Sequence, residues 1–434
     1  MKLRSIGLLA AMMLVAVACG GGGATTAPTG APTGAPTSAP SATAAPTDPG
    51  TEDPLGVRII PAGESVHIVM WGVLSGPDSA LGIDVQRGVE IAVEDRPEVA
   101  GRTIELTSED GLCTPEGGNT AATRIAADVT VVGLVGSVCS DETAGGIELI
   151  TNAGLTTISP SNTRPSLTAP DRGPEFAGYL RTAHNDEFQG AKAAEFVYNE
   201  LGLTRAATIH DGSSYAEALQ GVFADEFIAL GGEITLQTAV GAEDEQMGPV
   251  LTTVAETDPE IIYYPVFTAP FGRITDQVRA VPGLETVALM GADAGFSAAA
   301  IEAGGENALG LYLSSPDTRQ FPEGYASFLE KHLAKYNEAP LQIFHAHAYD
   351  ATNMLLDAIE AVATEGADGS LMIPLGALRD EIYSTANYQG VTGILTCGEF
   401  GDCGAPAIGV YEITQDIVDD PAGAWPPDPI YPEL

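Results

Sequence analysis

Basic residues are scarce in this 434-residue chain. Only 18 Lys and Arg stand against 59 Asp and Glu, and the formal net charge is −41 at pH 7. A field of this sign repels nucleic acid and anionic lipid surfaces, so we expect no nucleic-acid partner. The charge says nothing about the fold, and a solubilising surface suited to a salty or acidic setting is enough to account for it.

Signatures of catalysis and metal binding are also missing from the sequence. It contains no G-x-S-x-G elbow, no P-loop and no H-E-x-x-H helix. His345 and His347, in "HAHAYDA", lie two residues apart and would face different sides of a helix. We therefore expect a solvated or capping role for both, no shared metal and no cofactor. A hydrolase needs a nucleophile, a base and an oxyanion site in one cleft, which these motifs do not supply, so the sequence does not indicate an enzyme.

The chain has no long apolar run at its start. Two basic residues precede an apolar stretch at residues 7–18 that ends before Cys19. The stretch is shorter than the roughly 20 residues of a permanent transmembrane helix, so residues 1–18 predict a secretory signal peptide. The small residues Ala16 and Ala18 ahead of the cysteine resemble a bacterial lipobox, which implies a lipid on Cys19 and attachment to the cell membrane. Ordinary cleavage that leaves Cys19 free is the alternative.

Large apolar residues are almost absent from residues 19–56, where Pro, Thr, Ala and Gly dominate. Such a segment cannot bury a core and should stay extended and solvated. It is predicted to be a tether between the lipid anchor and the folded part of the chain.

Cysteines are few, and export predicts how they are used. Thiols tend to pair in an oxidising compartment, and four cysteines besides the lipidated one permit three connectivities. Cys397 and Cys403 are six residues apart across the glycine-rich "CGEFGDC", which favours a local bridge and leaves Cys113 to Cys139. A metal site is the competing interpretation, but neither pair has C-x-x-C spacing or a histidine near it in sequence.

Short apolar runs alternate with longer amphipathic ones after the tether. This alternation predicts parallel sheets with crossover helices, and the length favours two α/β lobes over one. The predicted strands cover residues 66–73, 103–109, 130–136, 155–159, 205–210, 260–266 and 286–291, and the predicted helices cover 81–95, 117–128, 214–230 and 271–281.

Hydroxyl residues follow two of the predicted strands. In open parallel sheets, ligands bind beyond the carboxyl ends of the strands. Ser140 stands where a helix should begin after residues 130–136, and a helix amino terminus attracts an anion. Ser161 and Thr163, in the next such turn, could add donors for the same small carboxylate. Plain helix capping is the alternative for these residues.

Several segments, in order and spacing, resemble a known family. They are "VLSGPDSALGIDVQRGVEIAVED", "SEDGLC", "GSVCSDET", "TISPSNTRPSLT", "HDGSSYAEAL" and "IIYYPVF". The chain is similar to the type I periplasmic binding proteins of branched-chain amino acid ABC transporters. The resemblance implies an α/β fold of two lobes, each a mostly parallel sheet flanked by helices, with a ligand cleft between them. It implies a first lobe at 65–182 and 312–394 and a second lobe at 183–311 and 395–434.

The resemblance also assigns roles to residues of the first lobe. Cys113 and Cys139 would close a loop that fixes the turn carrying Ser140. Ser140 and Thr163 would bind the ligand carboxylate, and Ser161 would offer its backbone carbonyl to the ammonium group.

The second lobe would supply the remaining contacts. Tyr215 and Phe267 would close over the ligand, and Asp293 falls where the family carries a glutamate that pairs with the ammonium. Three positions depart from the family: Asp293 is one methylene shorter, Phe267 replaces a usual tyrosine, and Leu81 occupies a place that is often aromatic. These departures leave the ligand's side chain open, and Asp293 could instead be a loop cap.

The resemblance implies a monomeric, lipid-anchored extracytoplasmic receptor that captures a small neutral amino acid and delivers it to an ABC transporter permease. Within the same fold, the alternatives are a binder of amides, urea or small carboxylates, or a sensory receptor. An exported hydrolase is the alternative from another class.

We expect Cys19→Ser to abolish membrane attachment while leaving ligand binding intact, because the tether separates the anchor from the lobes. Fractionation of cells after a salt wash, together with calorimetry on the released protein, checks both halves. A variant that stays with the membranes would show that the lipidation hypothesis is wrong.

Overall fold

The structure is a computed structural model that describes residues 53–433. Cys19, the predicted signal peptide and most of the predicted tether lie outside the described residues. No helix within 53–433 is long and apolar enough to cross a membrane.

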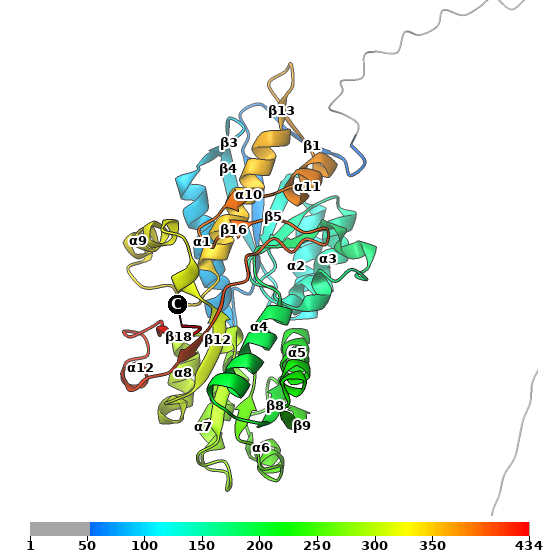
Figure 1. Cartoon of the computed structure of the whole chain (residues 1–434). Coiled ribbons are helices and arrows are strands. Elements are labelled where there is room, and N and C mark those ends of the chain that lie inside the picture. The colour runs from blue at the N-terminus through cyan, green and yellow to red at the C-terminus, as the bar shows by residue number, and fades with distance from the viewer. Residues whose placement is uncertain (1–52, 434) are drawn as a thin grey trace, which may run out of the picture. The chain divides into compact units, whose positions relative to one another are not determined.

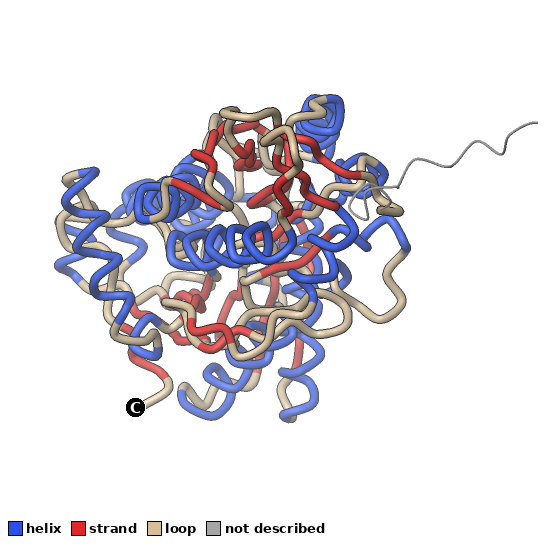
Figure 2. Tube along the Cα trace, turned by 90° about the horizontal axis from the view of Figure 1, so that it is seen from above, coloured by secondary structure: helices blue, strands red, loops and turns tan. Residues whose placement is uncertain are grey.

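The first sheet has the strand order β3-β4-β2-β5-β6-β7 and is parallel except for the β3–β4 pair. Figure 1 shows it flanked by helices, and Figure 2 shows the same layering from above. Its elements are β2 (Val66–Gly72), α1 (Ser79–Asp95), β3 (Glu98–Val99), β4 (Arg102–Asp110), α2 (Pro115–Ala127), β5 (Val131–Gly136), α3 (Ser140–Asn152), β6 (Thr157–Ser159) and β7 (Tyr179–Arg181), with α10 (His345–Val362) and α11 (Leu375–Tyr383) from later in the chain.

Strand β2 explains why this sheet is covered on both faces. All seven of its residues are buried, and successive side chains point to opposite faces. Val69 and Trp71 pack in one cluster with residues of α2 and α3, whereas Ile68 and Met70 belong to the cluster that contains residues of α1 and α10. A continuous apolar strand is the pattern expected between two helical layers.

The second sheet has the order β18-β17-β12-β11-β10-β8-β9. The strands from β9 to β12 pair in parallel, and the β12–β17 and β17–β18 pairs are antiparallel. Its elements are α4 (Asp186–Glu195), β8 (Arg205–His210), α5 (Ser214–Leu230), β9 (Glu233–Ala239), α6 (Gly248–Ala255), β10 (Ile261–Tyr263), α7 (Thr268–Val278), β11 (Ala288–Gly291), α8 (Ala298–Gly304), β12 (Tyr312–Pro316), β17 (Ile408–Glu412), α12 (Gln415–Asp419) and β18 (Pro429–Tyr431).

The predicted two-lobe α/β fold is confirmed, and each predicted strand and helix overlaps an element of the structure. The chain passes between the sheets after β7, after β12 and before β17. Because β12 pairs with β11 and β17, residues 312–316 belong to the second sheet, although the predicted first-lobe segment begins at 312. The lobe boundaries as such remain a prediction.

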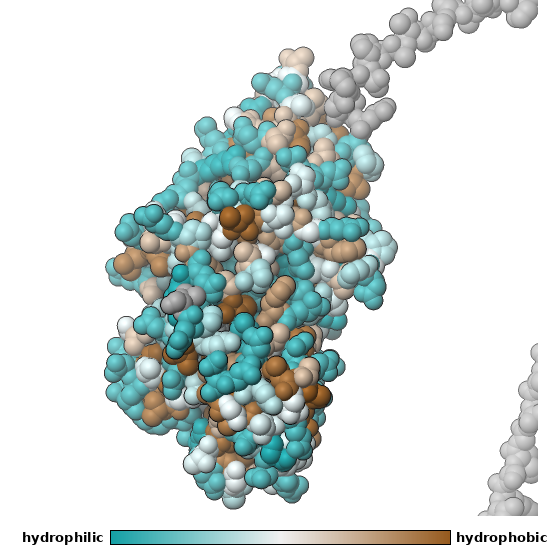
Figure 3. Space-filling model, in the orientation of Figure 1, coloured by the Kyte–Doolittle hydropathy of each residue, from teal (hydrophilic) through white to brown (hydrophobic). Residues whose placement is uncertain are grey.

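Shorter elements complete the described chain. The face visible in Figure 3 is mostly hydrophilic, with separated apolar patches. The remaining elements are β1 (Val57–Ile60), β13 (Thr364–Glu365) and β14 (Leu371–Pro374), which form a small sheet, the hairpin of β15 (Tyr388–Gln389) and β16 (Ile394–Leu395), and α9 (Gly324–Tyr336).

The prediction that His345 and His347 are solvated or capping residues is wrong, because both side chains are buried. His345 Nδ1 lies 3.1 Å from Asp84 Oδ2, and its Nε2 lies 2.9 Å from the Tyr325 hydroxyl. Burial lowers the pKa of His347 to about 3. The cause is the packing of α10 against α1, a tertiary contact that the spacing of two histidines does not reveal.

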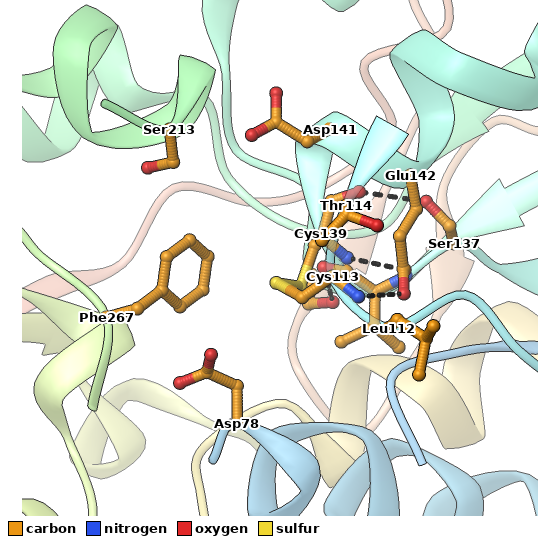
Figure 4. The surroundings of a disulfide bond; sticks show 12 residues. Asp78, Leu112, Cys113, Thr114, Ser137, Cys139, Asp141, Glu142, Ser213 and Phe267 are labelled. Carbon is orange, nitrogen blue, oxygen red and sulfur yellow. Dashed lines mark hydrogen bonds between the residues drawn. A yellow bond between two sulfur atoms is a disulfide. The ribbon is translucent and has the colours of Figure 1, made fainter. Parts of the chain in front are cut away.

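A buried carboxylate holds the connection between β5 and α3. Glu142 accepts hydrogen bonds from the backbone N–H groups of Cys113 at 2.9 Å and of Val138 and Cys139 at 3.0 Å each (Figure 4). The predicted disulfide joins Cys113 to Cys139 in the same place. Burial raises the pKa of Glu142 from 4.5 to about 7 against the opposing effect of these three bonds.

We expect this carboxyl group to make the fold less stable as pH rises. Its folded pKa lies above its unfolded value, so its stabilising contribution is complete below about 4.5 and is lost as pH rises through 7. The loss amounts to roughly 3 kcal/mol. Urea unfolding of the native protein and of Glu142→Gln at pH 4.5 and 7.5 tests this. The difference in free energy of unfolding between the two proteins should shrink at the higher pH, and a constant difference would contradict the assignment.

Candidate functional site

A small cavity lies between the two lobes, beyond the carboxyl ends of strands from both sheets. Six of the seven predicted ligand residues line it, and Thr163 is not among its lining residues. The lining consists of Leu81, Val138, Cys139, Ser140, Ser161, Tyr215, Phe267, Asp293, Ala294 and Phe344.

Ser140 is the first residue of α3 and points a hydroxyl at this region. Its Oγ is buried and has no hydrogen-bond partner among residues 53–433. The first backbone N–H groups of a helix also lack partners within the helix. Gly136, at the end of β5, has φ +141°, and a Cβ there would lie 2.1 Å from the Trp71 carbonyl oxygen. Only glycine therefore allows the close approach that places the α3 amino terminus at the cavity.

The turn after β6 brings a second set of hydroxyl groups. Ser161 Oγ donates to the Val138 carbonyl at 2.8 Å, which ties this turn to the loop before α3. The Thr163 carbonyl accepts from the Asp186 N–H at 2.9 Å. The Thr163 hydroxyl is buried beside the Asp186 carboxyl group, and its hydrogen bond acts to lower the pKa of that group. Ser140 is therefore the hydroxyl of this end that lines the cavity without a partner within residues 53–433.

Asp293 provides the negative end of the site. It follows β11, is only 3% exposed and lines the cavity. Its Oδ1 accepts hydrogen bonds from the Tyr215 hydroxyl at 2.6 Å and from Gln189 Nε2 at 2.8 Å. The side chain is therefore held by two residues of the second lobe, Gln189 on α4 and Tyr215 on α5. Burial, with Asp293 as the next cause, raises the pKa of Tyr215, so its hydroxyl stays protonated.

Asp186 is a second carboxylate that the sequence analysis missed. It is the first residue of α4, it is fully buried, and its neighbour for hydrogen bonding is the Thr163 hydroxyl. Burial and the neighbouring Asp293 raise its pKa well above the ordinary value. The short strand β7 that precedes Asp186 has no apolar run to mark it. The rule that ligands bind beyond the ends of strands therefore did not select Asp186. Gln189 was missed for the same reason.

The remaining wall of the cavity is apolar. Leu81 comes from α1, Val138 from the loop before α3, and Phe344 precedes α10. Phe267 lies 5.5 Å from Tyr215 between ring centroids. The cavity therefore combines two polar ends with an apolar side. Phe344 had no signal in the sequence, because residues 337–344, which join α9 to α10, carry no strand or helix pattern.

Carboxylates of the first lobe contact helix amino termini of the second. Asp141 Oδ2 accepts from the Ser214 N–H at 3.2 Å, and Asp78 Oδ1 accepts from the Thr268 N–H at 3.1 Å. Burial raises the pKa of Asp78. Figure 4 shows both carboxylates beside Phe267 and the Cys113–Cys139 bridge. These residues line a groove of about 1080 Å³ that shares Phe267 with the cavity.

This arrangement of two α/β lobes around a small polar cavity is that of a solute receptor. The chain belongs to the periplasmic binding protein family, which it matches over residues 65–396. It is thus a periplasmic binding protein of the ABC-transporter type, a family whose members bind small molecules.

The relatives include amino-acid receptors. The Leu/Ile/Val-binding protein of Escherichia coli K12 is 26% identical over 256 residues, which cover 58% of this chain and 68% of that protein. The leucine-specific-binding protein of Salmonella typhimurium is 24% identical over 360 residues, which cover 81% of this chain and 92% of that protein.

Solved structures show the same fold. A leucine binding protein of Thermotoga maritima has a TM-score of 0.72 and 26% identity, with 81% of this chain and 96% of that chain covered. A Rhodopseudomonas palustris solute binding protein in complex with benzoate has a TM-score of 0.70 and 17% identity, with 81% and 94% covered.

We expect Asp78→Asn and Asp141→Asn to speed ligand release. A carboxylate at a helix amino terminus is worth about 0.3–1 kcal/mol, so each loss of charge should raise the off-rate roughly two- to fivefold. Stopped-flow measurement of the release of bound ligand checks this.

Asp225→Asn is the matched control, because Asp225 is an exposed carboxylate on the same α5. An equal effect of the control, or no effect of either site variant, would show that these contacts do not hold the lobes together.

Proposed function

We propose that this protein captures a small neutral amino acid of the branched-chain kind in the cavity between its lobes. One observation carries the proposal: a single cavity has a helix amino terminus with the unpaired Ser140 hydroxyl at one end and a buried carboxylate, Asp293, at the other. A zwitterion matches both ends at once.

The first lobe would bind the ligand carboxylate. Ser140 offers a hydroxyl group that lines the cavity and is buried and unpaired within residues 53–433. Buried polar groups nearly always find partners, which supports a bound acceptor at Ser140, and Thr163 would add a second hydroxyl. The α3 amino terminus adds a partial positive charge. Ser161 would offer its backbone carbonyl to the ammonium group.

The second lobe would bind the ammonium. Asp293 already accepts two hydrogen bonds, and a cation would supply the positive charge that it lacks. Tyr215 would close over the ligand, and its hydroxyl would hold the Asp293 carboxylate in place. Asp186 is close enough to Asp293 for the Asp293 charge to raise the pKa of Asp186.

The apolar wall would hold the side chain. Leu81, Phe267 and Phe344 form a surface without charge, which suits an aliphatic side chain. The departures at Leu81, Phe267 and Asp293 from the family pattern leave the choice among such side chains to experiment.

Binding of amides, urea or simple carboxylic acids is less favoured, although a structural neighbour binds benzoate. Such a ligand brings no positive charge to Asp293, and a buried carboxylate without a partner is costly. A hydrolase is disfavoured by the family, whose members are binding proteins.

We further propose that a lipid on Cys19 anchors the receptor as a monomer outside the cytoplasm, and that its closed form is recognised by an ABC transporter permease. The lipobox-like sequence and the extracytoplasmic relatives support this. Thermal melts of the soluble part against all amino acids, amides, urea and aromatic acids test the ligand class.

We expect Asp293→Asn to weaken binding of the best amino acid by two to three and a half decades. Removing one partner of a buried ion pair costs roughly 3–5 kcal/mol. The des-amino analogue should bind the native protein poorly, since it leaves Asp293 unpaired, and should lose little or gain with the Asn variant.

Calorimetry on both proteins with both ligands completes this cycle. If the substitution weakens the two ligands equally, or weakens neither, Asp293 is a structural cap and the zwitterion proposal loses its main support.

A further inference from the structure

A fully buried arginine supports the turn that carries Ser161 and Thr163. Arg181 is the last residue of β7, and its side chain is 0% exposed. Its Nη1 donates to the carbonyl oxygens of Asn162 at 3.1 Å and Arg164 at 2.8 Å, and its Nη2 donates to Thr168 Oγ1. A guanidinium is a rigid planar fork, so its orientation fixes the positions of all three acceptors.

The orientation of the Arg181 guanidinium also depends on the group that binds its Nε. Its Nε donates to Asp402 Oδ1, and this is its salt bridge. The backbones of the two segments also pair: the Arg181 N–H donates to the Gly401 carbonyl at 2.9 Å, and the Cys403 N–H donates to the Arg181 carbonyl at 3.0 Å. Asp402 thus joins the last segment that crosses between the lobes, before β17, to the first such segment, after β7.

The second predicted disulfide presents Asp402. Cys397 is bonded to Cys403, and within this loop the Gly398 N–H donates to the Asp402 carbonyl at 2.7 Å. Gly401 has φ +86°, and a Cβ there would lie 2.6 Å from the Tyr179 carbonyl oxygen. A glycine at this position is what lets the cross-linked loop reach the end of β7.

We propose that Asp402 is a positioning residue for the carboxylate end of the ligand site. Held by the Cys397–Cys403 loop, it orients Arg181, which in turn sets the position of Ser161 and Thr163. The expected effect on ligand binding rests on the proposed function. The structural link from Asp402 through Arg181 to the Ser161–Thr163 turn does not. Asp402 Oδ2 also accepts from Asn185 Nδ2 at 3.3 Å, a weaker contact, and Asn185 caps α4 through its own Oδ1 without help from Asp402.

The contacts of Arg181 predict which part of a ligand will bind less tightly when Asp402 is replaced. Without Asp402, the guanidinium keeps its donors to the turn but loses the partner that orients it, so the Ser161–Thr163 backbone shifts. The ammonium end is built on Asp293, which accepts from Gln189 and Tyr215, and on the Ser161 carbonyl, and only the Ser161 carbonyl belongs to the turn that Arg181 supports. A ligand without a carboxylate should therefore be weakened less by the change than a ligand that carries one.

The test compares Asp402→Ala and the shape-preserving Asp402→Asn with Glu399→Ala, which removes an exposed carboxylate from the same loop. Calorimetry uses three probes: L-leucine, 4-methylpentanoate without the ammonium, and 3-methylbutylamine without the carboxylate. We expect the Asp402 variants to weaken both carboxylate-bearing probes roughly ten- to a hundredfold, the range seen for residues that orient metal ligands. The amine should be weakened less than either carboxylate-bearing probe, the Glu399 variant should bind all three probes like the native protein, and Asp402→Glu should restore part of the affinity.

Hydrogen exchange without ligand provides a second readout. Backbone amides of residues 161–164 should exchange faster in the Asp402 variants than in Glu399→Ala. If L-leucine does not bind the native protein, the proposed function loses support, and exchange still decides the structural link. Unchanged exchange at 161–164, equal weakening of the amine and the carboxylate probes, or an equal effect of Glu399→Ala would each overturn the proposal.

Discussion

A carboxylate enclosed between two lobes needs a positive partner, and this requirement governs the site. Asp293 and Asp186 are both buried and close enough for one to raise the pKa of the other. Two like charges in a low-dielectric space cannot both stay ionised at low cost. The apolar wall increases this cost, since it keeps water away from the carboxylates. On the proposed function, the ammonium group of the ligand would be the positive partner of Asp293 in the closed arrangement.

Hydrogen bonds also join the two lobes at the mouth of the cleft. The N–H groups of Thr268 and Ser214 donate these hydrogen bonds to Asp78 and Asp141, and each contact is worth about 0.3–1 kcal/mol. Such contacts are small beside the several kcal/mol that a buried charge without a positive partner costs. On the proposed function, the ligand supplies the difference through its higher affinity for the closed state.

The sequence predicted the parts of the structure that repeat a simple pattern. Strands such as β2 and β5 are continuous apolar runs, and the rule that ligands bind beyond the ends of strands led directly to Ser140 and Ser161. It did not lead to Asp186 or Gln189, because β7 is only three residues long and has no distinctive pattern.

Other misses have a different physical origin. Phe344 reaches the cavity from the connection between α9 and α10, and the burial of His345 depends on Asp84, more than 250 residues away in the chain. Asp293 could be selected only through the family resemblance, since a lone aspartate after a strand is also a common loop cap.

The strand order has a consequence for how the protein is made. The first sheet is covered on one face by α10 and α11, and the second sheet contains β17 and β18, all from the last quarter of the chain. Neither lobe can complete its core from the residues that emerge first during synthesis. Contacts between residues this distant in sequence form slowly, because closing the long loop loses entropy before the contacts contribute any favourable energy. On the proposed extracytoplasmic location, the chain would therefore remain without a finished core while it crosses the membrane, which is the state that export of an unfolded polypeptide requires.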